Sequence, residues 1–80
     1  MIVMVLIKVT DSSVVYSYQP GGKGKPGTVE YNSKTKRAVV TETAEDSYQY
    51  DAWKSCNKVE RLVEERGVNG LPSRCLVAWH

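Results

Sequence analysis

The chain has few of the residues that build catalytic and metal centres. Its 80 residues include two cysteines and a single histidine. Disulfide-held secreted domains usually carry four or more cysteines, so Cys56 and Cys75 do not make such a framework. Their spacing is also too long for a zinc knuckle, and His80 is the last residue, where a side chain is poorly held. We therefore expect buried, inert thiols, with no metal, no cofactor, no small-molecule ligand and no enzymatic activity.

The sequence also lacks a strong charge of one sign and a long apolar run. A formal net charge of +2 gives no electrostatic reason to expect nucleic acid or a membrane surface as a partner. The most apolar run, residues 1–7, is far shorter than the roughly 20 residues of a membrane-spanning helix. It has neither the basic segment nor the cleavage site of a signal peptide. We expect a cytoplasmic protein with a single α+β domain over residues 1–80.

One stretch, residues 44–66, has the periodicity of an α-helix. Apolar and small residues recur there at steps of three and four, namely Tyr48, Ala52, Cys56, Val59, Leu62 and Val63. This spacing places them on one stripe of a helix. Thr43 followed by Asp46 fits a capping box, with Asp46 or Ser47 as alternative caps. Gly67 suits the end of the helix.

The remaining segments predict strands and turns. Alternating or β-branched stretches predict five strands, at residues 2–9, 14–19, 28–33, 36–43 and 74–79. Short turns join the first four strands into an antiparallel meander. The helix then returns the chain so that the fifth strand lies beside the first. The sequence therefore predicts an α+β fold of topology ββββαβ. It is a single five-stranded antiparallel sheet, order 4-3-2-1-5, with one long α-helix packed on one face.

The first predicted strand is apolar on both faces. Alternation places Val3, Val5, Ile7 and Val9 on one face, and Ile2, Met4 and Leu6 on the other. The sequence does not show which of these faces the helix covers. We expect the helix to cover the first set, which leaves Ile2, Met4 and Leu6 on an open sheet face. An apolar patch there is a common place for subunits to meet.

Two aromatic side chains fall outside the apolar stripe of the predicted helix. Tyr50 and Trp53 lie on its polar side, near Asn57. A tryptophan in that position is covered either by another part of the chain, such as Leu71 or Trp79, or by a partner. Together with the open sheet face, they predict a non-enzymatic interaction module. It would act by association, as a homodimer or with a protein partner.

A segment rich in glycine and proline, residues 20–27, contains the string G-x-G-x-x-G. In dinucleotide-binding folds this string follows a strand and opens a helix, whereas here it leads into a strand. The alternative function is weak binding of single-stranded nucleic acid, by base stacking on sheet aromatics and anion contact from the loop. Its candidate residues are Tyr16, Tyr18, Tyr31, Lys23 and Lys25. The low net charge makes nucleic acid the less favoured partner.

Overall fold

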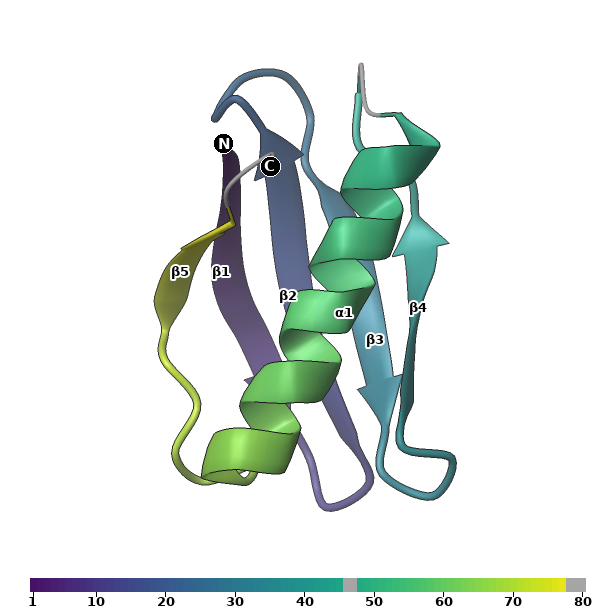
Figure 1. Ribbon diagram of the computed structural model, residues 1–80, viewed down its shortest axis with the longest axis vertical. Helices are drawn as coiled ribbons and strands as arrows, with labels where there is room; N and C mark the ends of the chain where they lie inside the picture. Colours follow the sequence, from purple (N-terminus) through teal and green to yellow (C-terminus); the bar gives the residue numbers. More distant parts are fainter. Residues whose placement is uncertain (46–47, 78–80) are drawn as a thin grey trace.

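The computed structural model describes residues 1–45 and 48–77. Its elements in chain order are β1 (Ile2–Val9), β2 (Ser13–Pro20), β3 (Gly27–Asn32), β4 (Arg37–Glu42), α1 (Gln49–Arg66) and β5 (Arg74–Val77). The strands form one antiparallel sheet of order β4-β3-β2-β1-β5. Helix α1 runs obliquely across one face of this sheet (Figure 1). The predicted fold class, topology and strand order are confirmed.

Helix α1 begins later than the sequence pattern suggested. Its first residue is Gln49, and Tyr48 is the N-cap with extended backbone angles. The Asp51 carboxylate accepts a hydrogen bond from the Tyr48 backbone N–H at 3.0 Å, which satisfies an otherwise free donor at the helix start. The predicted caps Asp46 and Ser47 lie outside the described residues.

The buried face of α1 is turned relative to the predicted apolar stripe. Its buried residues are Asp51, Ser55, Val59 and Leu62, and the half-buried ones that pack on the core are Ala52, Cys56 and Val63. The Ser55 hydroxyl donates to the Asp51 carbonyl at 2.8 Å, so this buried polar group is satisfied within the helix. Tyr48, which we expected in the stripe, is 77% exposed because it precedes the helix.

The placement of Ile2, Met4 and Leu6 on the open sheet face is wrong. Ile2 and Met4 are fully buried in the core, and Leu6 is half-buried against it. Met4 lies opposite Tyr18 in the ladder, and directly opposed residues share a face of the sheet. Tyr18 is itself fully buried, so this pairing fixes which face of β1 is covered. Alternation within an apolar strand cannot decide this, because either face would bury well.

A β-bulge divides β1. The β1–β2 register shifts between Leu6 and Lys8, which makes Ile7 the extra residue. Beyond the shift, Val9 lies opposite Val14, a fully buried core residue. Val9 is therefore on the covered side of the sheet, although at the end of the strand it is 41% exposed. The expectation that Val9 shares a face with Ile7 is wrong, since simple alternation does not continue through a bulge.

The segment between α1 and β5 is attached to the sheet by hydrogen bonds. Gly67 ends the helix with a φ of 73°, in the left-handed region that favours glycine. The Tyr16 hydroxyl donates to the Pro72 carbonyl at 2.6 Å. The Leu6 N–H donates to the Ser73 carbonyl at 2.8 Å. These bonds guide the chain from the end of α1 to its position beside β1.

Gly27 lies at a point of close approach between β2, β3 and the segment after β4. It is opposite Tyr18 in the ladder. A Cβ at this position would come within 2.4 Å of the Ala44 nitrogen and of the Glu42 carbonyl oxygen. The Tyr18 hydroxyl accepts a hydrogen bond from the Ala44 N–H at 3.0 Å. Only glycine lets the backbone pass close enough for this arrangement.

Candidate interaction surfaces

The first candidate surface is the sheet face opposite α1. We call it the open face and define it by its apolar residues Val3, Val5, Ile7, Val15, Val39 and Leu76. In Figure 1 the helix lies in front of the sheet, so the open face is the side turned away from the viewer. Ile7 is 56% exposed, Leu76 50% and Val5 42%. The neighbouring strands β1 and β5 therefore present apolar side chains to solvent on one side of the molecule.

The Gly/Pro loop covers only one corner of the open face. Gly22 packs against Val3, since a Cβ on Gly22 would lie 3.5 Å from a Val3 methyl. The Gln19 side-chain amide donates to the Gly24 carbonyl at 2.5 Å, which holds the loop over the end of β2. Val3 is accordingly half-buried.

The open face carries charges of both signs among its apolar residues. Glu30 is exposed and lies between Val15 and Val39 in the ladder. Lys8 lies opposite Val15, and Arg74 lies opposite Val5. A surface with both signs can be complementary to another copy of itself.

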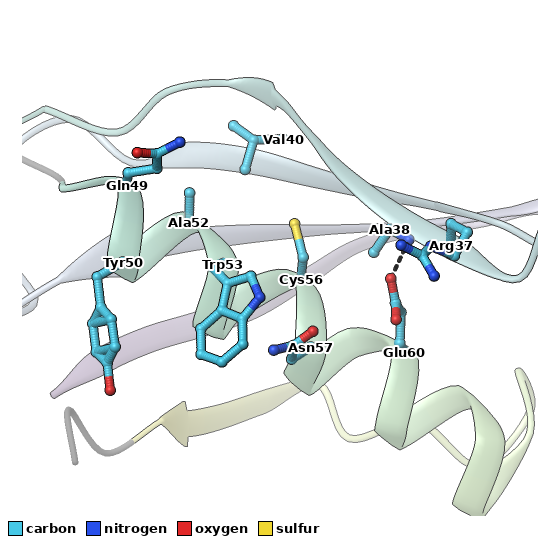
Figure 2. A pocket seen from close by; sticks show the side chains of 10 residues that line it. All are labelled: Arg37, Ala38, Val40, Gln49, Tyr50, Ala52, Trp53, Cys56, Asn57 and Glu60. Carbon is cyan, nitrogen blue, oxygen red and sulfur yellow. Dashed lines mark hydrogen bonds between the residues drawn. The ribbon is translucent and has the colours of Figure 1, made fainter.

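The second candidate surface is a hollow between α1 and the edge strand β4, with a cavity volume of about 650 Å³. We call it the α1–β4 groove, and Figure 2 shows its lining. The lining residues are Arg37, Ala38, Val40, Gln49, Tyr50, Ala52, Trp53, Cys56, Asn57 and Glu60. Small apolar side chains from both elements form the interior of the groove, and aromatic and polar side chains surround them.

Tyr50 and Trp53 lie outside the buried face of α1, as the helical periodicity predicted. They are 47% and 59% exposed. Their ring centroids are 6.1 Å apart, and the Lys54 ammonium lies 5.4 Å from the centre of the Tyr50 ring. Of the two segments expected to cover Trp53, Leu71 packs on the core instead, and Trp79 lies outside the described residues. Two large aromatic side chains thus remain open to solvent beside the groove.

A hydrogen bond joins the helix to the backbone of the edge strand at the end of the groove. The Glu60 carboxylate accepts a hydrogen bond from the Ala38 N–H at 2.8 Å, drawn as a dashed line in Figure 2. Sequence reasoning missed this role of Glu60. No local pattern signals it, because the bond joins residues on different elements and depends on how the helix lies on the sheet.

Both cysteines are free and half-buried. Burial raises the pKa of the Cys56 thiol, and the nearby Glu60 carboxylate raises it further. Burial also raises the pKa of the Cys75 thiol, while Lys58 and Arg66 oppose the shift. A raised pKa keeps a thiol protonated at neutral pH, and it is the thiolate that reacts. These environments therefore disfavour nucleophilic chemistry at either cysteine.

The structure does not bring together the residues proposed to bind nucleic acid. Tyr16 and Tyr18 are fully buried and Tyr31 is 6% exposed, so the expectation that these rings stack bases is wrong. They belong to the core on the face that α1 covers. Lys23 and Lys25 lie on the exposed loop, and the Lys25 ammonium pairs with the Glu42 carboxylate at 3.1 Å.

Comparison with protein-family models, with curated proteins and with solved structures gives no match. Over residues 1–45 and 48–77, no helix has the length and apolar character needed to cross a membrane. The described part of the chain also holds no cluster of three or more histidine, cysteine or acidic residues arranged to bind a metal.

Proposed function

We propose that the protein is a non-enzymatic interaction module that self-associates through its open face. The observation that carries the proposal is the exposure of Val5, Ile7 and Leu76 on the side of the sheet opposite α1. An antiparallel sheet with one solvated face usually alternates apolar and polar residues. Strand β1 departs from that rule, because both of its faces are apolar. A second layer packed on this face would remove these side chains from water.

A second copy of the chain is the occupant that the charges favour. In a two-fold dimer the same patch meets itself, so each charge must find an opposite charge or solvent. The open face offers Glu30 together with Lys8 and Arg74. Two stacked sheets related by such an axis can place acidic groups of one copy near basic groups of the other. Face-to-face sheets normally pack about 10 Å apart, which suits side chains of valine, isoleucine and leucine size.

Light scattering across a range of protein concentrations tests this proposal. We expect the mean mass of the wild-type chain to rise above that of a monomer as the concentration increases. Ile7→Lys should give a lower mean mass than the wild type at each concentration, because it places a charge in the middle of the patch. The matched control is Asn69→Lys, which adds the same charge to an exposed loop residue outside the patch and should associate like the wild type. A wild-type chain that stays monomeric, or an Ile7→Lys chain that associates equally well, would contradict the proposal.

We further infer a cytoplasmic location. Cys56 and Cys75 are both free thiols. Reducing compartments keep cysteines in this form, whereas secreted proteins more often pair them. Fractionation of cells that express the chain, followed by detection with an antibody, tests this inference; recovery from the secreted fraction would contradict it.

A further inference from the structure

We infer that β4 pairs edge to edge with β4 of a second copy, and that the α1–β4 groove is completed by that copy. This contact deepens the proposed self-association by naming a second surface. It uses the edge of the sheet and the groove beside it, and it shares only Val39 with the open face.

Some backbone groups of β4 point outward from the edge of the sheet. This strand lies at the end of the strand order and pairs with β3 only. The Ala38 N–H bonds to Glu60, so it points away from β3. In an antiparallel strand the groups that point outward recur at every second residue. The N–H and carbonyl of Val40 therefore point the same way as those of Ala38, since the β3–β4 register is regular between these two residues. Such outward groups can bind another strand.

The charges at the two ends of β4 are of opposite sign, which favours pairing with a second copy. The basic residue Lys36 directly precedes β4, which begins with the basic residue Arg37 and ends at Glu42. A two-fold axis at Val39 pairs Ala38 of each copy with Val40 of the other. The same register brings the basic end of each strand to the acidic end of the other, where opposite charges attract. In the single copy Glu42 pairs with Lys25, but both side chains are more than half exposed, and such pairs contribute little.

The bulge in β4 selects this register among those that the backbone permits. The β3–β4 register shifts beyond Val40, where Thr41 is the extra residue. An axis at Val40 would place this irregular segment inside the new ladder, whereas an axis at Val39 keeps Ala38 and Val40 at its centre. The register centred on Val39 is therefore the one that uses the regular part of the edge.

The α1–β4 groove lies beside the strand edge that a second copy would occupy. The side chains of Ala38 and Val40 line it, and an added strand would place the same two side chains of the second copy beside them. The apolar surface beneath Tyr50 and Trp53 would then continue into the other copy. Tyrosine and tryptophan are the residues that most often anchor protein interfaces. The contact thus gives a partner to Tyr50 and Trp53, which are 47% and 59% exposed in the described structure.

Glu60 competes with the second copy for the edge. Its carboxylate holds the Ala38 N–H, which in the dimer would donate to the Val40 carbonyl of the other copy. Natural sheets often guard their edges with charged groups of this kind. Removing the carboxylate should leave the Ala38 N–H free for the other strand, and so favour pairing.

Site-specific disulfide formation tests the inference. In the inferred register Val39 lies opposite its own equivalent, with Cβ atoms about 4.5–5.5 Å apart, close to the distance that a disulfide spans. We expect Val39→Cys to form a covalent dimer under mild oxidation, with the 39–39 bond identified by peptide mapping. The matched control is Thr41→Cys on the same exposed strand, which would lie opposite Arg37 and should not cross-link to itself. Equal cross-linking of the two variants would overturn the inference.

Further variants separate this contact from the open face. The cross-link should persist in the Ile7→Lys background and disappear with Val40→Pro, which removes an outward N–H and leaves the β3–β4 ladder in place. If the cross-link disappears in the Ile7→Lys background and persists with Val40→Pro, the edge contact is overturned while the open-face proposal stands. If Val40→Pro fails to fold, the Glu60→Ala variant tests the edge contact in its place. It should raise the dimer fraction by at least about a hundredfold at low concentration, because two charged hydrogen bonds, one in each copy, no longer have to be broken. An unchanged or lower fraction would count against the inference.

Discussion

Truncation of adjacent residues in β1 tests which face of the sheet the helix covers. Met4 is fully buried opposite Tyr18, whereas its neighbour Val5 is 42% exposed on the open face. The variants Met4→Ala and Val5→Ala both remove apolar atoms from the same strand. Their consequences for stability should nevertheless differ greatly, because only one of them creates a cavity.

The expected magnitude follows from the burial of each side chain. Truncation of a fully buried methionine to alanine typically costs about 2–5 kcal/mol, and Met4 has no exposed surface that would lessen this cost. A chain of 80 residues has a core that supports a total stability of only roughly 5 kcal/mol. Met4→Ala should therefore remove about half or more of the free energy of unfolding. Val5→Ala should cost less than about 1 kcal/mol.

Urea unfolding monitored by far-ultraviolet circular dichroism measures both values. It should be done at several low protein concentrations, so that association through the open face does not add to the apparent stability. The slope of free energy against urea should be similar for the two variants, since each changes the exposed surface only slightly. A larger loss for Val5→Ala than for Met4→Ala at all concentrations would refute the assignment of the covered face.

Three further substitutions probe the contacts that hold the core. Gly27→Ala should destabilise the fold by at least about 2 kcal/mol in urea unfolding, since its Cβ would lie 2.4 Å from the Ala44 nitrogen. A loss under about 0.5 kcal/mol would show that the backbone adjusts freely there. Tyr18→Phe leaves the buried Ala44 N–H without its acceptor and should cost about 1–3 kcal/mol; rapid hydrogen exchange of that amide in the variant checks the cause. Burial, aided by Cys75, raises the pKa of Tyr16 to about 12 from a usual 10.0. As the pH rises, the Tyr16 hydroxyl therefore loses its proton in the unfolded chain before it does so in the folded chain. The free energy of unfolding is unaffected by this proton below about pH 10 and falls by about 2–3 kcal/mol as the pH rises to 12. Tyr16→Phe should cost about 1 kcal/mol at neutral pH through loss of the bond to Pro72, and its stability should decline less over that range. Parallel declines in the variant and the wild type would contradict the assignment to Tyr16.

Local pattern predicted the architecture because each element has a strong periodicity. The change from alternation to helical spacing after β4 marks α1, and Gly67 marks its end. Short turns leave an antiparallel meander as the natural arrangement of the first four strands. The return path of the helix then places β5 beside β1. None of these steps requires knowledge of contacts between distant side chains.

The surfaces were harder to predict because they depend on contacts between elements. Met4 and Val5 are equally apolar, so alternation alone could not show which of them lies under the helix. The bulge at Ile7 changes the face of the sheet on which the later side chains of β1 lie, and no residue in that stretch signals the bulge. Asp51 and Ser55 look like surface residues in the sequence, yet they are buried, because each forms a hydrogen bond at the start of α1.

The position of β1 in the strand order has a consequence for synthesis of the chain. β1 precedes β5 by more than sixty residues in the chain, and it pairs with β2 on one side and with β5 on the other. Its second edge therefore waits until residues 74–77 have been synthesised. Until then a nascent meander exposes an apolar strand whose backbone groups have no neighbour on that side.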